Sequence, residues 1–142
     1  MKASVLLCDA AQAVDGKLYI LGGGIALVGS PSSFAVAITA KVPWSGAHEQ
    51  HTWKLDLVDA DGDVVDLGGG PISIGGEFRV APSIDAQPGM TLSWPFAVNF
   101  AMVPLAAGSQ YQFNLTIDNV TDEGWCVDFW TRSASASQAQ AG

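Results

Sequence analysis

The stretch PLAAGSQYQFNLTIDN, residues 104–119, decides the fold. Its second half alternates polar side chains with a row of large apolar ones, namely Tyr111, Phe113, Leu115 and Ile117. Successive side chains of a β-strand point to opposite faces, so a period of two predicts a strand that is buried on one face. A tyrosine at the head of this row brings a polar hydroxyl to the core, and that hydroxyl needs a hydrogen-bond partner.

The same alternation recurs along the chain between closely spaced Gly, Pro and Asp-Gly breakers. The further apolar rows are Phe34, Val36, Ile38, Ala40 and Val42; His51, Trp53, Leu55 and Leu57; Ile72, Ile74, Phe78 and Val80; Trp94, Phe96, Val98, Phe100 and Met102; and Trp125, Val127 and Phe129. Short alternating segments of this kind are typical of an all-β protein. We predict a single antiparallel β-sandwich of seven to nine strands over residues 1–132, followed by a disordered Ser/Ala/Gln tail at residues 133–142.

Leu105, Gly108 and Tyr111 stand in the spacing L-x-x-G-x-x-Y. This spacing resembles the tyrosine corner of immunoglobulin-like and fibronectin type III sandwiches, where the tyrosine hydroxyl bonds to backbone a few residues upstream. The resemblance implies an immunoglobulin-like Greek-key topology, with the Tyr111 hydroxyl bonded to backbone near Leu105. Ala107 stands where the motif often has proline, and Phe113 stands where antibody-type domains have their second cysteine. A sandwich without the inter-sheet disulfide is therefore implied.

Two longer segments carry a second resemblance. LLCDAAQAVDGKLYILGGG at residues 6–24 and HTWKLDLVDADG at residues 51–62 resemble an uncharacterised family of small bacterial proteins that are largely actinobacterial. The resemblance implies a bacterial source and an unknown function, and it supplies no site residues.

The chain is acidic, with a net charge of −8 at pH 7 and an isoelectric point near 4.3. Its 6 basic residues are scattered, which argues against nucleic acid and anionic membranes as partners, because both require clustered Lys and Arg. No apolar run approaches the roughly 20 residues that span a bilayer, so we expect no membrane insertion. The apolar run at residues 5–8 is too short for a secretion signal. We therefore predict a cytoplasmic protein in which Cys8 and Cys126 are free thiols.

Catalytic chemistry is not indicated by the sequence. His48 and His51 are the only histidines, and residues three apart on an extended chain point to opposite faces, so the pair does not suit one metal ion. His51 falls in register with Trp53 and is expected to be partly buried at a strand end. No Ser-His-Asp or Cys-His arrangement is visible around it. We expect no catalytic residue, no cofactor and no metal ligand set.

The acidic segment DADGDVVD, residues 59–66, resembles the first half of a calcium-binding loop. Val64 replaces the glycine of that loop and Gly70 replaces its last carboxylate, so a hairpin turn is the preferred interpretation. A calcium site remains the alternative if this loop meets Asp118, Asp122 or Glu123 at one end of the fold.

Two of the five tryptophans, Trp44 and Trp130, are candidates for exposed aromatic side chains. Aromatic side chains at a surface serve protein interfaces as readily as sugars. A ligand-binding sandwich for carbohydrate is therefore the alternative to a protein-binding one.

A self- or partner-binding interface is the principal functional hypothesis, and its candidate residues are Ala35, Ala37, Ala97, Ala101 and Val103. They alternate with core rows and so face away from the core. A face meant for water usually carries charged side chains or threonine, whereas these positions are small and apolar. Two alternatives stay open: scattered alanines carry no meaning, or a loop such as residues 22–33 covers them.

Overall fold

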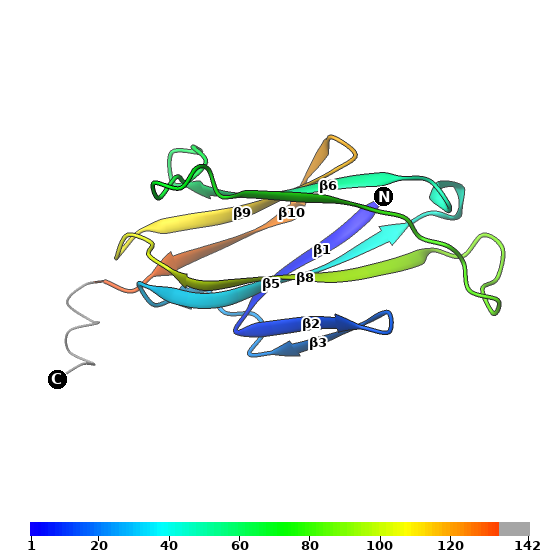
Figure 1. Cartoon of the computed structure of the whole chain (residues 1–142), viewed down its shortest axis with the longest axis horizontal. Helices are drawn as coiled ribbons and strands as arrows, with labels where there is room; N and C mark the ends of the chain where they lie inside the picture. The colour runs from blue at the N-terminus through cyan, green and yellow to red at the C-terminus, as the bar shows by residue number, and fades with distance from the viewer. Residues whose placement is uncertain (134–142) are drawn as a thin grey trace.

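The computed structural model describes residues 1–133, and this part of the chain is all-β, as predicted (Figure 1). Its strands are β1 (Lys2–Cys8), β2 (Ala10–Val14), β3 (Lys17–Leu21), β4 (Leu27–Val28), β5 (Ser32–Val42), β6 (His51–Asp59), β7 (Ser73–Phe78), β8 (Leu92–Val103), β9 (Gln110–Ile117) and β10 (Val120–Thr131). A short 3-10 turn, η1 (Trp44–Gly46), separates β5 from β6. No helix within residues 1–133 has the length and apolar composition to cross a membrane. The predicted tail lies outside the described residues except for Ser133, which is exposed.

The strands form three sheets. One sheet has the order β1-β5-β8, a second has the order β4-β10-β9-β6-β7, and β2 pairs with β3 as a separate hairpin. In Figure 1, β6, β9 and β10 lie in one layer, β5 and β8 in a second, and the hairpin lies outside that second layer. The pairing of β10 with β4 is parallel, so the wholly antiparallel arrangement is wrong for this pair. The strand count of seven to nine is too low for residues 1–133, because the two-residue β4 and the small side chains of β2 give no clear alternation.

The predicted apolar rows meet between the two larger sheets and form one core. Phe34 of β5 lies 5.9 Å from Phe113 of β9 and 5.7 Å from Phe129 of β10, measured between ring centroids. All three rings are at most 1% exposed. Burying an aromatic or aliphatic side chain of this size contributes about 1.5–3 kcal/mol, so these facing rows are what hold the sheets together.

One row changes face because β8 contains a bulge. Ser32 pairs with Val103 and Phe34 pairs with Phe100, so β8 advances three residues where β5 advances two. An extra residue in one strand inverts the alternation beyond it. Met102, with φ of 49°, is therefore exposed, and Val103 is buried in the core. The predictions of Met102 in the core and of Val103 at an interface are both wrong for this reason.

The hairpin of β2 and β3 turns at Asp15 and Gly16. Their φ angles of 51° and 74° suit a two-residue type I′ turn, which matches the twist of paired strands. The side chain of Asn99 on β8 donates a hydrogen bond from Nδ2 to the carbonyl of Ala11, at 3.0 Å. The hairpin is thus attached to the outer face of the three-stranded sheet.

This hairpin covers the small residues of β5. Ala35 and Ala37 face away from the main core but are only 0% and 2% exposed. Together with Cys8 and Ala11 they form a second buried cluster, against which Ala97 packs. Small side chains let the second layer approach the backbone closely.

The predicted interface is therefore wrong at Ala35 and Ala37, and Ala97 is only partly accessible. Ala101 remains exposed. The segment that covers the alanines is residues 10–21 and not residues 22–33.

Candidate functional site

The outer face of the five-stranded sheet carries polar side chains along β9, next to the buried Val58 of β6. On β9, Gln110, Gln112 and Asn114 alternate with the core residues and so point outward. On β10, Trp130 pairs with Gln110 and Asp128 pairs with Gln112. We call this surface the β9 face, defined by these five outward residues. It combines amides, a carboxylate and an indole on one flat support.

Three neighbouring depressions hollow this surface. The first, of about 460 Å³, lies at the Trp130 end and is lined by Asp59, Ala60, Asp61, Gly108, Ser109, Gln110, Tyr111 and Trp130. The second, of about 140 Å³, is lined by Asp59, Ala60, Gln110, Tyr111, Gln112 and Asp128. The third, of about 480 Å³, is lined by Gln112, Asn114, Leu115, Thr121, Asp122, Glu123, Trp125 and Cys126. The second shares lining residues with both others, so the three are neighbours along β9, and together we call them the groove.

The acidic segment at residues 59–66 forms the turn that closes one end of this groove. The Oδ1 atom of Asp59 accepts hydrogen bonds from the backbone N–H of Asp61 at 3.0 Å and of Asp63 at 3.1 Å. The carboxylate thereby fixes the loop, as Asp does in turns. Its neighbour Asp61 lies beside Trp130 in the first depression.

The three acidic segments do not converge on a calcium site. Asp59 pairs with Tyr111 at the start of β9, whereas Asp118 directly follows the last residue of that strand. At about 3.3 Å per residue these two ends are about 20 Å apart. Asp122 and Glu123 line the third depression and Asp59 lines the first and second. The convergence on which the calcium alternative depended is therefore absent from residues 1–133.

The other end of the groove is made by a large bulge in β10. Thr121 pairs with Thr116 and Cys126 pairs with Asn114, so several residues of β10 stand opposite a two-residue step of β9. The backbone N–H of Gly124 donates to Oδ1 of Asp122 at 2.8 Å and stabilises the bulge. Irregularities of this kind redirect side chains at sheet surfaces.

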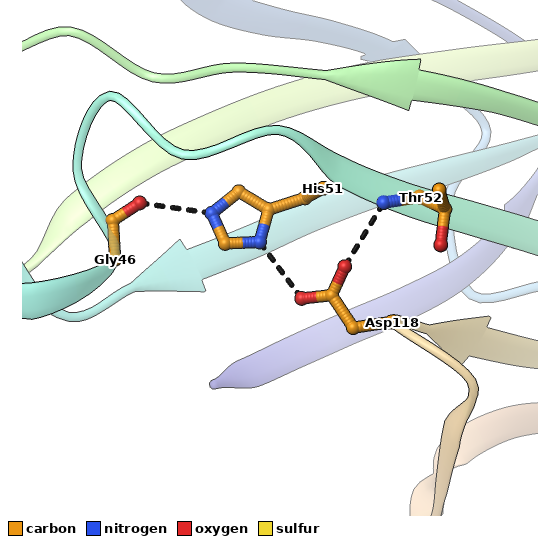
Figure 2. A network of polar contacts seen from close by, with 4 residues as sticks. All are labelled: Gly46, His51, Thr52 and Asp118. Carbon is orange, nitrogen blue, oxygen red and sulfur yellow. Dashed lines mark hydrogen bonds and ion pairs between the residues drawn. The ribbon is translucent and has the colours of Figure 1, made fainter.

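A separate polar network surrounds His51 (Figure 2). It lies toward the Ile117 end of β9, whereas Trp130 pairs with Gln110 at the other end. The Nδ1 atom of His51 lies 2.7 Å from Oδ2 of Asp118, and its Nε2 atom lies 2.9 Å from the carbonyl oxygen of Gly46. The other carboxylate oxygen of Asp118 accepts the backbone N–H of Thr52 at 3.0 Å. A carbonyl oxygen and a carboxylate both accept hydrogen bonds, so this arrangement favours the doubly protonated, cationic form of His51 paired with Asp118.

The ionisation of this pair follows from its surroundings. Burial lowers the pKa of His51, but the hydrogen bonds to Asp118 and Gly46 outweigh it, so the pKa lies above its ordinary value. Burial raises the pKa of Asp118, but hydrogen bonds from His51 and Thr52 outweigh that effect and hold the pKa below its ordinary value. Both ring nitrogens of His51 are thus occupied by oxygen atoms of the chain itself, at Asp118 and Gly46.

The two cysteine thiols lie in different environments. The Cys8 thiol is buried and lies 3.5 Å from the carbonyl oxygen of Ala35. Burial, and then the negative charge of Asp9, raise its pKa above the ordinary value, so the reactive thiolate is disfavoured. Sγ of Cys126 lies 3.2 Å from the carbonyl oxygen of Glu123. Both thiols are free.

The two candidate aromatic residues lie in different environments. Trp130 is 51% exposed and borders the first depression. Trp44 is half-buried and packs against the core, so it does not belong to a surface site. Only Trp130 of the pair is brought to the β9 face.

Of the three residues in the L-x-x-G-x-x-Y spacing, Gly108 and Tyr111 line the first depression. Tyr111 is 6% exposed, and its hydroxyl oxygen accepts the backbone N–H of Ala106 at 3.0 Å. Leu105 is buried, and its carbonyl accepts a hydrogen bond from the Ser30 hydroxyl. Gly108 has a φ of 65°, which glycine adopts without strain. These residues fix the loop between β8 and β9, where the amide row begins.

Sequence reasoning missed the amide row and the Asp118 partner of His51. Gln110, Gln112 and Asn114 were visible as the polar half of the 104–119 alternation, which identifies an outward face but not whether another layer covers it. His51 and Asp118 are far apart in the chain, and no local pattern indicates their contact.

Comparison with known proteins gives one result. No curated protein matches the sequence. A family of unknown function, DUF6941, has a model that matches residues 3–125, which is most of the chain. The expected membership of a family without an assigned activity is therefore confirmed, and the chain belongs to the DUF6941 family.

Proposed function

We propose that this chain is a non-catalytic binding module that holds another protein against its β9 face. The observation that carries the proposal is the difference between the outer faces of the two sheets. The hairpin covers Ala35 and Ala37 on the outer face of the three-stranded sheet, whereas the outer face of the five-stranded sheet is hollowed along β9. Extended concave surfaces with a few convergent polar groups are typical of binding sites.

The strand order supports an immunoglobulin-like Greek-key sandwich as the scaffold. In that fold one sheet contains strands A, B and E and the other contains G, F and C. The orders β1-β5-β8 and β10-β9-β6 correspond to these sets in chain order, with the hairpin as an insertion after the first strand. The Tyr111 hydroxyl at the start of β9 is where a tyrosine corner would stand.

The non-catalytic part of the proposal is supported by the positions of His51 and Cys8, which lie outside the groove, whereas the free thiol of Cys126 lines its third depression. The His51 ring has both nitrogens bonded to acceptors, and it lies toward the Ile117 end of β9. The Cys8 thiol is buried beneath the hairpin. The amides and carboxylates of the β9 face suit recognition, whereas bond cleavage would need an activated nucleophile or a poised base.

The proposal also covers the localisation, source and domain bounds of the protein. We place the module in the cytoplasm of a bacterial, largely actinobacterial source, with residues 1–132 as one domain and no nucleic acid partner. The free thiols favour a reducing compartment. The net charge of −8 disfavours binding to phosphate backbones.

A carbohydrate is the second candidate occupant. Trp130 is half-exposed and lies beside Gln110 and Ser109 in the first depression. An aromatic ring with neighbouring amide and hydroxyl groups suits a sugar as well as a side chain of a protein.

The experiment is to purify the wild-type chain and two matched variants from the native cell and to compare the proteins that co-purify with each. Gln112→Arg places a long cation in the middle of the groove, and Tyr19→Arg places the same side chain on the exposed hairpin. We expect a protein recovered with the wild-type chain to be lost with Gln112→Arg and kept with Tyr19→Arg. The reverse pattern moves the site to the hairpin, and equal recovery with both variants rules out the β9 face.

A further inference from the structure

The groove is lined by acidic side chains, and none of the described residues that line it is a cation. Its acidic lining residues are Asp59, Asp61, Asp122, Glu123 and Asp128, and no Lys, Arg or His lines any of the three depressions. The ion pairs within residues 1–133 are His51 with Asp118 and Lys54 with Asp56. Both pairs lie outside the lining.

The partners that these carboxylates do have are neutral. Asp59 accepts backbone N–H groups of its own loop, Asp122 accepts that of Gly124, and Asp128 lies 3.3 Å from the side-chain amide of Gln112. A neutral donor satisfies a hydrogen-bond acceptor but does not balance its charge. Charge complementarity therefore favours a cationic occupant.

The indole of Trp130 favours an Arg or Lys side chain as the cation. Its half-exposed indole shares the first depression with Asp59 and Asp61. The face of a tryptophan ring attracts Arg and Lys side chains, and Arg also stacks on it. Aromatic and acidic groups in one depression are the environment that a guanidinium or ammonium group prefers.

The row of side-chain amides on β9 favours a partner segment in an extended conformation. Gln110, Gln112 and Asn114 repeat at every second residue of β9, which is about 6.6 Å per repeat and about 13 Å in total. An extended peptide presents backbone groups with the same repeat, and side-chain amides both donate to and accept from such groups. The row ends at Trp130 in one direction and at the acidic bulge of β10 in the other.

We propose that the β9 face binds an extended basic peptide segment of a partner protein, with an Arg or Lys side chain held between Trp130 and Asp61 and a second cation near Asp122 and Glu123. This inference rests on the proposed function and names the chemistry of its partner. The amides of Gln112 and Asn114 hold the segment between the two cation positions.

The test uses the full chain and three synthetic probes, measured by calorimetry. The probes are a capped peptide of alternating arginine and alanine, the same peptide with glutamate for arginine, and a neutral glucan oligosaccharide. We expect the arginine peptide alone to bind and to shift the side-chain amide NMR signals of Gln110, Gln112 and Asn114. Trp130→Ala should weaken binding on the order of fivefold.

Two charge-matched double variants distinguish specific binding of the peptide in the groove from nonspecific attraction of a basic peptide to an acidic protein. Asp61→Asn with Asp128→Asn removes two charges from the groove, and Asp15→Asn with Asp85→Asn removes two charges elsewhere. We expect about tenfold weaker arginine-peptide binding for the first variant and less than twofold for the second. Equal losses in both variants overturn the inference, because binding then follows net charge alone.

The remaining outcomes distinguish this inference from the proposed function. If the glucan binds and shifts the amide signals while the arginine peptide does not, the basic-peptide assignment is wrong and the face binds a sugar. If no probe binds, the inference fails. The proposed function still stands in that case if Gln112→Arg abolishes recovery of a native partner while Tyr19→Arg does not.

Discussion

The two outer faces of this fold differ in what their sequences look like and in what covers them. On β5 the outward residues Ala35 and Ala37 are small and apolar, and they are buried beneath the hairpin. On β9 the outward residues Gln112 and Asn114 are polar and remain partly exposed. An apolar outward row in a strand is thus better explained by a third layer within the same chain than by a partner. The open face is the polar one.

The largest expected effect comes from placing the same charge on each face. Ala37→Glu buries a carboxylate without a partner beneath the hairpin, and we expect a loss on the order of 3–5 kcal/mol in the free energy of unfolding, or failure to fold. Thr116→Glu is the matched control on β9, opposite Lys54, and should stay within about 0.5 kcal/mol. Denaturant unfolding measures both. Near-native stability of Ala37→Glu would show that the hairpin does not cover β5.

The second comparison is between a tyrosine of the core and a tyrosine of the hairpin. Tyr111→Phe removes the acceptor of the Ala106 N–H in a partly buried hydrogen bond, and a lost hydrogen bond of this kind costs on the order of 1 kcal/mol, so the variant should fold with reduced stability. Tyr19→Phe changes a residue that is 57% exposed and should be neutral. Thermal unfolding of both variants provides the measurement. If the two variants are equally stable, the hydrogen bond of the Tyr111 hydroxyl does not stabilise this fold.

These comparisons indicate how far the sequence alone predicts the structure. The alternation of Phe113, Leu115 and Ile117 predicted a strand correctly because period two is local information, and those residues are at most 1% exposed. Whether Ala37 is exposed to water or buried beneath the hairpin depends on where residues 10–21 pack. No local sequence pattern predicts that position. The bulge that turns Met102 outward was equally invisible.

The candidate site was predicted only in fragments. Trp130 and the Asp61 loop were identified separately, and the register of β10 and β9 with β6 brings them into one depression. The pairing of buried His51 with exposed Asp118 was not predicted, because it joins the start of β6 to the turn after β9. Contacts of this kind depend on sheet order, which the sequence shows only through resemblance.

The third prediction concerns the pH dependence of stability and follows from that pair. The pKa of His51 is raised in the folded state, so its contribution is complete below the unfolded value, about 6.5, and is lost as the pH rises through the folded value. The pKa of Asp118 is lowered, so its contribution is present above about 3.9 and is lost as the pH falls through its folded value. We expect the melting temperature to be higher at pH 5.5 than at pH 8.

Two variants assign this pH dependence to the pair. Asp118→Asn should reduce the difference in melting temperature between pH 5.5 and pH 8, because it removes the charge that favours the His51 cation. His48→Asn is the control, since His48 is exposed and asparagine tolerates its positive φ of 66°. The same reduction in both variants would contradict the assignment.

The smallest expected effect concerns the cost of keeping the β9 face acidic. Its carboxylates have no cation among the described residues that line the groove, so their mutual repulsion in a protein of net charge −8 opposes folding. Asp61→Asn with Asp128→Asn should raise the melting temperature on the order of a degree at low salt. The gain should shrink at high salt, because exposed charges are screened. Asp15→Asn with Asp85→Asn should raise it less, since those residues lie in the hairpin turn and in a separate loop.

A stability gain from removing groove carboxylates would mean that they are retained for binding and not for folding, as is usual for functional residues. A clear loss of stability would instead assign Asp61 and Asp128 to the architecture of the loops.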